Sequence, residues 1–263
     1  MAIRHHSRFI FVLLVLFAIA FPCVLSAQEA DENTSRQLWA NLILSFPKSE
    51  KLYLEYDIEA VRQVSGGEPW RYIYGTGLVE YYPSGFIDLT GELTTGFTRQ
   101  SEQENSFETT VRLGFRLHLI NQIFNSSFVK KYRPERMSGR KFSIANLARI
   151  EQRNFWYTGS RPSSHDVRFR NRLEFKLAIN KSTLAADGVW YLMADAEWFV
   201  PLSDNEVPER FATKLRNRAG LGYRHSYEWR FEVLAMRDKA RETLEGEVKV
   251  DALMLDLRIK WFL

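Results

Sequence analysis

Beyond its first segment the chain lacks cysteine, and it lacks any apolar run long enough to cross a membrane as a helix. Cys23 is the one cysteine among 263 residues, and it lies in the N-terminal segment that we expect to be removed. Disulfides and thiolate metal sites are therefore excluded from the mature protein. The apolar run at residues 9–21 is shorter than the roughly 20 residues that span a bilayer. A helical membrane protein is thereby excluded.

Signals for metal binding, nucleotide binding and catalysis are also absent. His118, His165 and His225 remain after processing, and none has a neighbour at metal-ligand spacing. Ser163 and Ser164 beside His165 are the one local arrangement that a lipid hydrolase could use, and a Ser-rich polar loop explains them equally well. No Gly-rich phosphate loop follows a strand and opens a helix. We therefore expect no catalytic residue, cofactor or metal, and rank a lipid-modifying hydrolase third among the function classes.

The first 27 residues have the pattern of a secretory signal. Arg4 and Arg8 precede the apolar run, and small residues follow it, so that cleavage after Ser26 or Ala27 is expected. Removing this segment takes away two bases and no acid, which leaves 34 Lys and Arg against 32 Asp and Glu. This slight excess in a densely charged chain does not indicate a nucleic-acid partner.

The clearest positive signal is strict alternation of residue type in Asp166–Ile179. One parity is apolar and the other is ionic: Phe169, Leu173, Phe175, Leu177 and Ile179 against Arg168, Arg170, Arg172, Glu174 and Lys176. Successive side chains of a strand point to opposite faces, so this pattern indicates a β-strand with one apolar and one charged face. A soluble sheet and a transmembrane barrel both produce such a strand.

Ten further segments alternate in the same way, and they favour a barrel. They cover residues 37–46, 51–62, 70–82, 86–98, 107–119, 141–157, 189–200, 211–224, 229–237 and 250–263. Most are about 10 to 15 residues long, whereas soluble strands average about 5 to 6 and a tilted strand that crosses a bilayer needs about 9 to 11. Aromatic residues gather near the strand ends, as interfacial belts require: Trp39, Tyr81, Tyr82, Trp156, Tyr157, Trp198, Phe199, Trp229, Trp261 and Phe262.

We therefore predict an all-β fold, a transmembrane antiparallel β-barrel of 10 to 12 strands in the bacterial outer membrane. A closed antiparallel barrel with both termini on one side needs an even count, so 12 is favoured, with the extra strand in the irregular residues 120–139. These residues otherwise form a long basic loop with room for a short helix. The predicted organisation is a signal peptide at 1–27, a mobile lead-in at 28–36 and the barrel at 37–263.

The ionic parity gives the candidate site, because it would line the lumen if the apolar parity faces lipid. The predicted lining residues are Glu55, Asp57, Glu59, Asp88, Glu92, Arg112, Arg116, Arg149, Glu151, Arg153, Arg168, Arg170, Arg172, Glu174, Asp195, Glu197, Arg216, Arg218 and Arg258. One wall is then mainly acidic and the other mainly basic. Two functions stay open: a narrow or largely closed barrel that passes small polar or ionic solutes, and a structural or interaction barrel whose loops bind a partner or lipopolysaccharide.

Four short motifs resemble an uncharacterised family of outer-membrane barrels, a domain of unknown function common in Bacteroidetes-like Gram-negative bacteria. The motifs are ARIEQR at 148–153, RFRNR at 168–172, DAEWF at 195–199 and RNRAGLGY at 216–223, together with Trp39 and the aromatic C-terminus. The resemblance implies the barrel fold and an outer-membrane location, and it implies no chemistry. The expected partners are outer-membrane lipids and, through the C-terminal strand, the barrel-assembly machinery.

Overall fold

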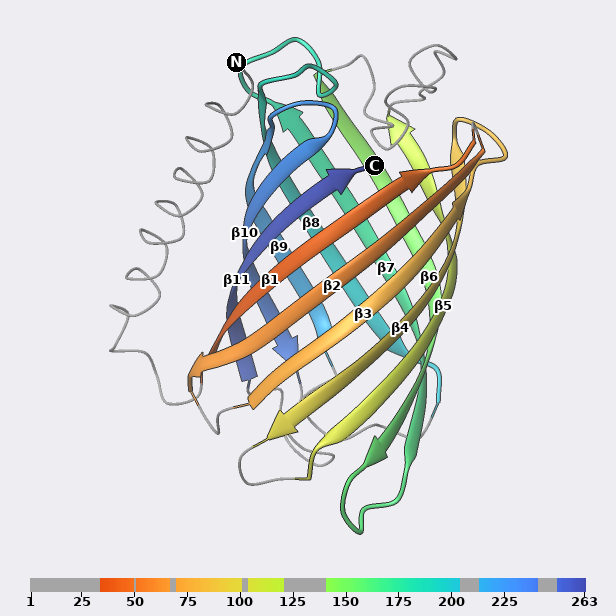
Figure 1. Ribbon diagram of the computed structural model, residues 1–263, viewed down its shortest axis with the longest axis vertical. Helices are drawn as coiled ribbons and strands as arrows, with labels where there is room; N and C mark the ends of the chain where they lie inside the picture. The colour runs from red at the N-terminus through yellow and green to blue at the C-terminus, as the bar shows by residue number, and fades with distance from the viewer. Residues whose placement is uncertain are drawn as a thin grey trace.

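The protein forms one closed β-barrel of tilted strands (Figure 1). The computed structural model describes residues 34–49, 51–66, 70–100, 104–120, 141–203, 213–240 and 250–263. The eleven strands within these residues are β1 Thr34–Pro47, β2 Leu52–Ser65, β3 Trp70–Tyr81, β4 Ile87–Gln100, β5 Ser106–Ile120, β6 Phe142–Tyr157, β7 Ser164–Ala178, β8 Val189–Pro201, β9 Thr213–Arg224, β10 Trp229–Ala240 and β11 Val250–Phe262. Across the same residues, no helix has the length and apolar character needed to cross a membrane.

The barrel closes by a parallel pair. Each strand from β1 to β10 pairs antiparallel with the next, whereas β11 runs parallel to β1, from Thr34 beside Asp251 to Ser45 beside Phe262. The predicted all-β barrel of 10 to 12 strands is confirmed, but the favoured count of twelve and the wholly antiparallel pairing are wrong. Because β5 pairs directly with β6, no further strand fits between them in the described barrel.

Several predicted segments lie outside the described residues. They are the signal peptide, most of the lead-in, and all but the first residue of the segment 120–139, where a basic loop or an extra strand was expected. Strand β1 begins at Thr34, so the last three residues of the predicted lead-in belong to the barrel. Below, the C-terminal end is the barrel end at which β11 finishes, and the N-terminal end is the one at which β1 begins.

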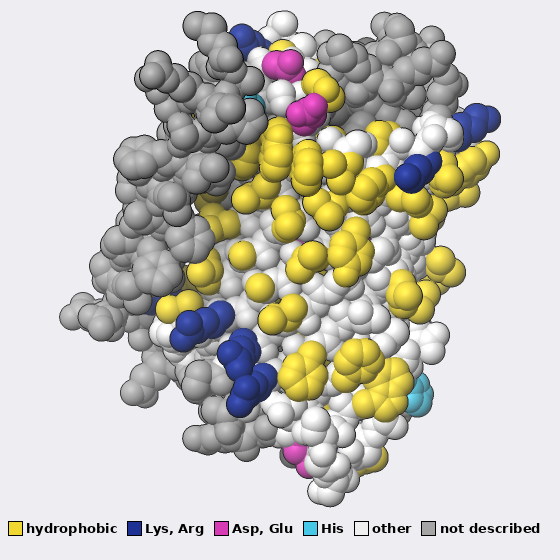
Figure 2. Space-filling view, in the orientation of Figure 1, with side chains coloured by type: hydrophobic (Ala, Val, Ile, Leu, Met, Phe, Trp, Pro, Cys, Tyr) yellow, Lys and Arg dark blue, Asp and Glu magenta, His cyan; other side chains and the backbone are white. Residues whose placement is uncertain are grey.

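Alternation sorts the side chains between the inside and the outside of the barrel. On β7, Leu173 and Phe175 are exposed, whereas Arg170 is buried and Glu174 half-buried on the inward parity. Large hydrophobic residues are exposed on nearly every strand, and Figure 2 shows them spread over the outer wall. A water-soluble protein buries such residues in a core, so the two faces are inverted relative to a soluble sheet.

Exposed aromatic residues form two belts on the outer wall. Tyr81, Trp190 and Trp261 lie toward the C-terminal end, and Phe97, Phe107, Trp156 and Trp198 lie toward the N-terminal end. In the first belt Trp229 stacks on Trp261, with ring centroids 5.2 Å apart. Eight residues separate Trp190 from Trp198 on β8, which is about 26 Å along the strand. At a tilt of about 40° the belts are about 20 Å apart in height, close to the roughly 25 Å apolar band of membrane barrels.

Half of the aromatic residues predicted for the belts carry the inward parity instead. Tyr81, Trp156, Trp198, Trp229 and Trp261 point outward, whereas the inward set is Trp39, Tyr82, Tyr157, Phe199 and Phe262. The reason is the strand period of two, since two consecutive aromatic residues must point to opposite faces. Four predicted pairs were consecutive, so each supplied one belt residue and one interior residue.

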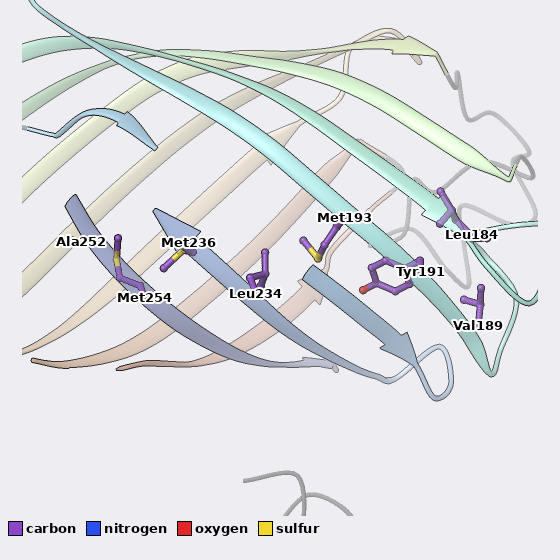
Figure 3. Packing of buried hydrophobic residues seen from close by; sticks show 9 residues of the cluster. Leu184, Val189, Tyr191, Met193, Leu234, Met236, Ala252 and Met254 are labelled. Carbon is purple, nitrogen blue, oxygen red and sulfur yellow. The ribbon is translucent and has the colours of Figure 1, made fainter. Parts of the chain in front are cut away.

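One stretch of the interior is apolar. Ala178, Leu184, Val189, Tyr191, Met193, Leu234, Met236, Ala252 and Met254 form a buried cluster, which Figure 3 shows following the barrel wall from Ala252 to Val189. Leu184 comes from the connection between β7 and β8, which is held against the barrel by an ion pair of 3.1 Å between Asp187 and Arg224. The inward parity is therefore charged over most strands and apolar over parts of β8, β10 and β11.

Candidate functional site: the charged interior

The charged residues predicted to line the lumen all carry the inward parity, and the structure buries or half-buries every one of them. Their arrangement follows from the strand period, which sends every second residue inside. A buried charge is tolerated only when it is paired and hydrogen-bonded. The pairing of these residues therefore decides whether the interior is filled or open.

Glu151 on β6 is the first centre of pairing. Its side chain is fully buried, and it accepts hydrogen bonds from Arg112 Nε at 2.7 Å, Arg168 Nε at 2.5 Å and Arg170 Nη1 at 3.1 Å. These three arginines come from β5 and β7, on either side of β6. Planar guanidinium groups with five N–H donors suit this crowded sharing of one carboxylate.

Glu197 on β8 is the second centre, and it is also fully buried. Arg170 Nη2 lies 2.9 Å and Arg149 Nη2 lies 3.3 Å from Glu197 Oε1, while Arg218 Nη2 lies 3.8 Å from Oε2. Arg149 also pairs with Glu92 on β4, which accepts a hydrogen bond of 3.3 Å from Arg112. We refer to these side chains as the arginine network: Glu92, Arg112, Arg149, Glu151, Arg168, Arg170, Glu197 and Arg218.

The other predicted arginines have carboxylate partners outside this network. The pairs are Arg116 with Glu80 and Glu174, Arg153 with Glu108 and Asp166, Arg172 with Glu174, Arg216 with Asp238, and Arg258 with Asp256 and Glu232. Arg218 also donates to Asp195 at 2.7 Å. The basic wall expected from the sequence is therefore interleaved with acids strand by strand, as cross-strand pairing favours.

Several contacts join strands that are not neighbours, so they must pass through the interior. Lys176 on β7 lies 3.8 Å from Glu232 on β10. The Arg216 guanidinium on β9 lies over the Trp39 ring on β1, 5.2 Å from its centroid. Arg149 on β6 reaches Glu197 on β8. Side chains thus reach over one or two intervening strands inside the barrel, at several levels between its two ends.

The predicted acidic wall is seen on one strand, β2, where two carboxylates lack a basic partner among the described residues. Glu55 pairs with Lys260 at 2.5 Å, but Asp57 and Glu59 have no ion pair with any residue that the structure describes. One carboxylate oxygen of each, Asp57 Oδ1 and Glu59 Oε1, is buried without a hydrogen-bond partner there. The neighbouring guanidinium of Arg258 pairs with Asp256 and Glu232 instead.

A match to a family described as a protein of unknown function, DUF2490, covers residues 36–243. The chain belongs to the DUF2490 family. The match takes in most of β1 and all of the strands to β10, and it ends before β11. It confirms the predicted resemblance to an uncharacterised family, whose description assigns no activity. No curated protein matches the chain.

The histidine and serine residues weighed for catalysis do not come together in this DUF2490 barrel. Ser164 carries the inward parity, with its hydroxyl 3.1 Å from that of Tyr157, whereas the next residue, His165, is exposed on the outward parity. His225 lies in the turn after β9. His118 does have a partner that the sequence did not indicate, since its Nε2 lies 2.9 Å from Asp88 Oδ2. Among the described residues no group of three or more His, Cys, Asp or Glu side chains could hold a metal ion.

Some interior charges were missing from the predicted lining. They are Glu80, Glu108, Asp166, Lys176, Arg224, Arg230, Glu232, Asp238, Asp256 and Lys260. Their strands alternate like the others, so the parity rule applied to every charged residue of each strand would have found most of them. Arg224 and Arg230 flank the turn between β9 and β10.

Proposed function

We propose that this DUF2490 protein is an outer-membrane barrel whose interior is closed by paired charges, and that it acts through its outer surface and ends. The observation that carries this proposal is the inversion of faces around the wall. Large hydrophobic side chains are exposed on the outside, while residues such as Glu151 and Glu197 are fully buried inside. An apolar surface of that extent suits lipid, because in water it would drive association.

A closed interior is favoured over an open pore by the strand number and by contacts that reach over intervening strands inside the barrel. About 8 strands give an interior just filled by side chains, whereas 16 to 18 leave an aqueous channel. Eleven strands lie nearer the first case, and Lys176, Arg149 and Arg216 reach partners on strands that are not their neighbours. The resemblance to outer-membrane barrels and the secretory pattern of residues 1–27 support the location.

Export gives the first test. In a Gram-negative host we expect a mature protein that begins at Ala27 or Gln28 and fractionates with the outer membrane, because Arg4 and Arg8 with the apolar run form a cleavable signal. Intact-mass measurement of the purified protein gives the N-terminus, and sucrose-gradient fractionation with markers for both membranes gives the location. A mature chain that retains residues 9–21, or one found in the soluble periplasm, would contradict the proposal.

The apolar outer face gives the second test. Phe175 is exposed on β7 and pairs with Ala194, which lies midway between the belt residues Trp190 and Trp198 of β8. We therefore expect Phe175→Arg to lower the free energy of unfolding in lipid by about 2 to 4 kcal/mol. Val64 is exposed at the end of β2, where the same change is expected to cost about 0 to 1 kcal/mol. Urea unfolding in vesicles, followed by tryptophan fluorescence, measures both, with Phe175→Leu as the control for side-chain shape.

Spin labels check the same face independently. Labels at positions 173, 175 and 177 should be accessible to oxygen dissolved in lipid, and labels at 172, 174 and 176 should not. The reverse pattern would mean that the apolar face packs against protein, and it would contradict the proposed membrane location.

A further inference from the structure

Three arginines form a row on the outer wall near the N-terminal end. Arg62 on β2 lies directly opposite Arg71 on β3, and Arg71 lies directly opposite Arg99 on β4. All three carry the outward parity and are exposed. Figure 2 shows Lys and Arg side chains gathered at the lower left of the barrel, where β2 finishes and β3 begins. This set, Arg62, Arg71 and Arg99, is referred to as the arginine row.

Among the residues that the structure describes, no carboxylate neutralises the arginine row. None of its three side chains has an ion pair or a hydrogen bond with any residue within the described ranges, whereas the arginines of the arginine network are paired with carboxylates. Like charges at directly opposed positions of neighbouring strands repel one another and destabilise the sheet. Three such positions in succession concentrate positive charge that an external anion would neutralise.

The position of the row indicates where that anion lies. The next outward positions toward the middle of the same strands are Ala60, Ile73 and Phe97, which are again direct cross-strand partners. Ile73 is 59% and Phe97 is 44% exposed. The arginine row therefore stands at the edge of the apolar wall, at the height where lipid headgroups begin if the wall faces acyl chains.

We propose that the arginine row binds the headgroup of an anionic lipid that carries more than one phosphate. This inference rests on the proposed membrane location. Guanidinium groups match phosphate oxygens with paired N–H donors, and they do so better than a lysine ammonium. Neighbouring strands are about 4.8 Å apart, so the row extends about 10 Å from Arg62 to Arg99. That span exceeds one phosphate group and suits two phosphates on one headgroup.

The test uses full-length refolded protein in a zwitterionic detergent. Bisphosphorylated lipid A, phosphatidylglycerol and inorganic phosphate are titrated separately, and binding is measured by native mass spectrometry and calorimetry. We expect the unmodified protein to bind lipid A at least tenfold more tightly than phosphatidylglycerol. The variant Arg62→Gln/Arg71→Gln/Arg99→Gln should weaken lipid A binding on the order of 100-fold, at roughly fivefold per guanidinium.

A matched variant removes the same charge from the opposite end of the barrel. Lys48, Lys51 and Lys181 are exposed in turns at the C-terminal end, and changing all three to Gln should leave lipid A binding within twofold of the unmodified protein. Equal losses in both triple variants would show a general charge effect and would overturn the inference. So would unchanged binding in the arginine variant.

The ligand assignment fails if phosphatidylglycerol binds as tightly as lipid A, or if inorganic phosphate alone does so. Failure of the unmodified protein to insert into lipid vesicles would count against the proposed membrane location. If the unmodified protein and the arginine triple variant both insert into vesicles and bind lipid A equally, the result counts against the arginine row and leaves the proposed membrane location standing.

Discussion

Replacing Glu197 by Gln is expected to lower the free energy of unfolding by about 3 to 5 kcal/mol, the usual cost of breaking a buried ion pair from one side. Glu197 is fully buried, and Arg149, Arg170 and Arg218 all lie within 4 Å of its carboxylate. Arg218 retains Asp195 and Arg170 retains Glu151, but the positive charge around position 197 is then no longer balanced. Urea unfolding of the refolded barrel in lipid vesicles measures the change.

Glu228 offers a control in the same protein. It lies in the turn between β9 and β10, where it accepts a 2.7 Å hydrogen bond from the exposed Tyr227 hydroxyl. Because that contact is open to solvent, Glu228→Gln should change the free energy of unfolding by less than about 0.5 kcal/mol. A loss below 1 kcal/mol for Glu197→Gln would show that the arginine network does not hold its charges in the buried arrangement described above.

Replacing Arg168, Arg170 and Arg172 together by Ser is expected to open a path through the barrel. Arg168 and Arg170 contribute two of the three guanidinium groups around Glu151, and Arg170 is the arginine closest to Glu197. Serine is much smaller, so the change removes both side-chain volume and positive charge from the middle of the interior. We expect at most a small conductance in the unmodified protein, whose interior is closed by paired charges, and a several-fold larger one in the variant. The ion preference should shift from anions toward cations because Glu151, Glu197 and Glu174 lose partners.

Planar-bilayer recordings with a salt gradient measure the conductance and the ion preference together. The variant Lys48→Ser/Lys51→Ser/Lys181→Ser makes the same charge change outside the interior and should conduct like the unmodified protein. The arginine variant should also unfold at a lower temperature, since three carboxylates lose buried partners. A large conductance in the unmodified protein would mean that side chains do not close the interior. No increase in the arginine variant would mean that Arg168, Arg170 and Arg172 do not block the path.

The strands and their faces could be predicted from local pattern. The alternation in residues 166–179 located β7, which spans Ser164–Ala178, and the last predicted segment at 250–263 located β11 at Val250–Phe262. Parity then assigned charged residues to the inward face, because the period of two is a property of the strand backbone itself. Neither step requires knowing which strands are neighbours.

Three features could not be predicted in the same way: how the barrel closes, which inward residues lie at the same height, and which of them form pairs. Pairing of β1 with β11 joins residues more than 200 positions apart, and no local pattern encodes its direction. The stagger of neighbouring strands decides which inward residues share a level. It therefore decides that Arg216 meets Trp39 and that Lys176 meets Glu232. The apolar cluster around Tyr191 and Met254 was missed for a different reason, since the inward parity was treated as uniformly ionic.

Because β1 and β11 pair in parallel, the first and last residues of the barrel lie at its opposite ends. A chain that crosses a bilayer an odd number of times enters from one compartment and leaves into the other. If the barrel spans a membrane as proposed, Thr34 and Leu263 therefore face different aqueous spaces. An affinity tag joined just before Thr34 and another joined after Leu263 would then be reached by antibody from opposite sides of the same membrane. In a barrel of ten or twelve strands, both tags would be reached from one side.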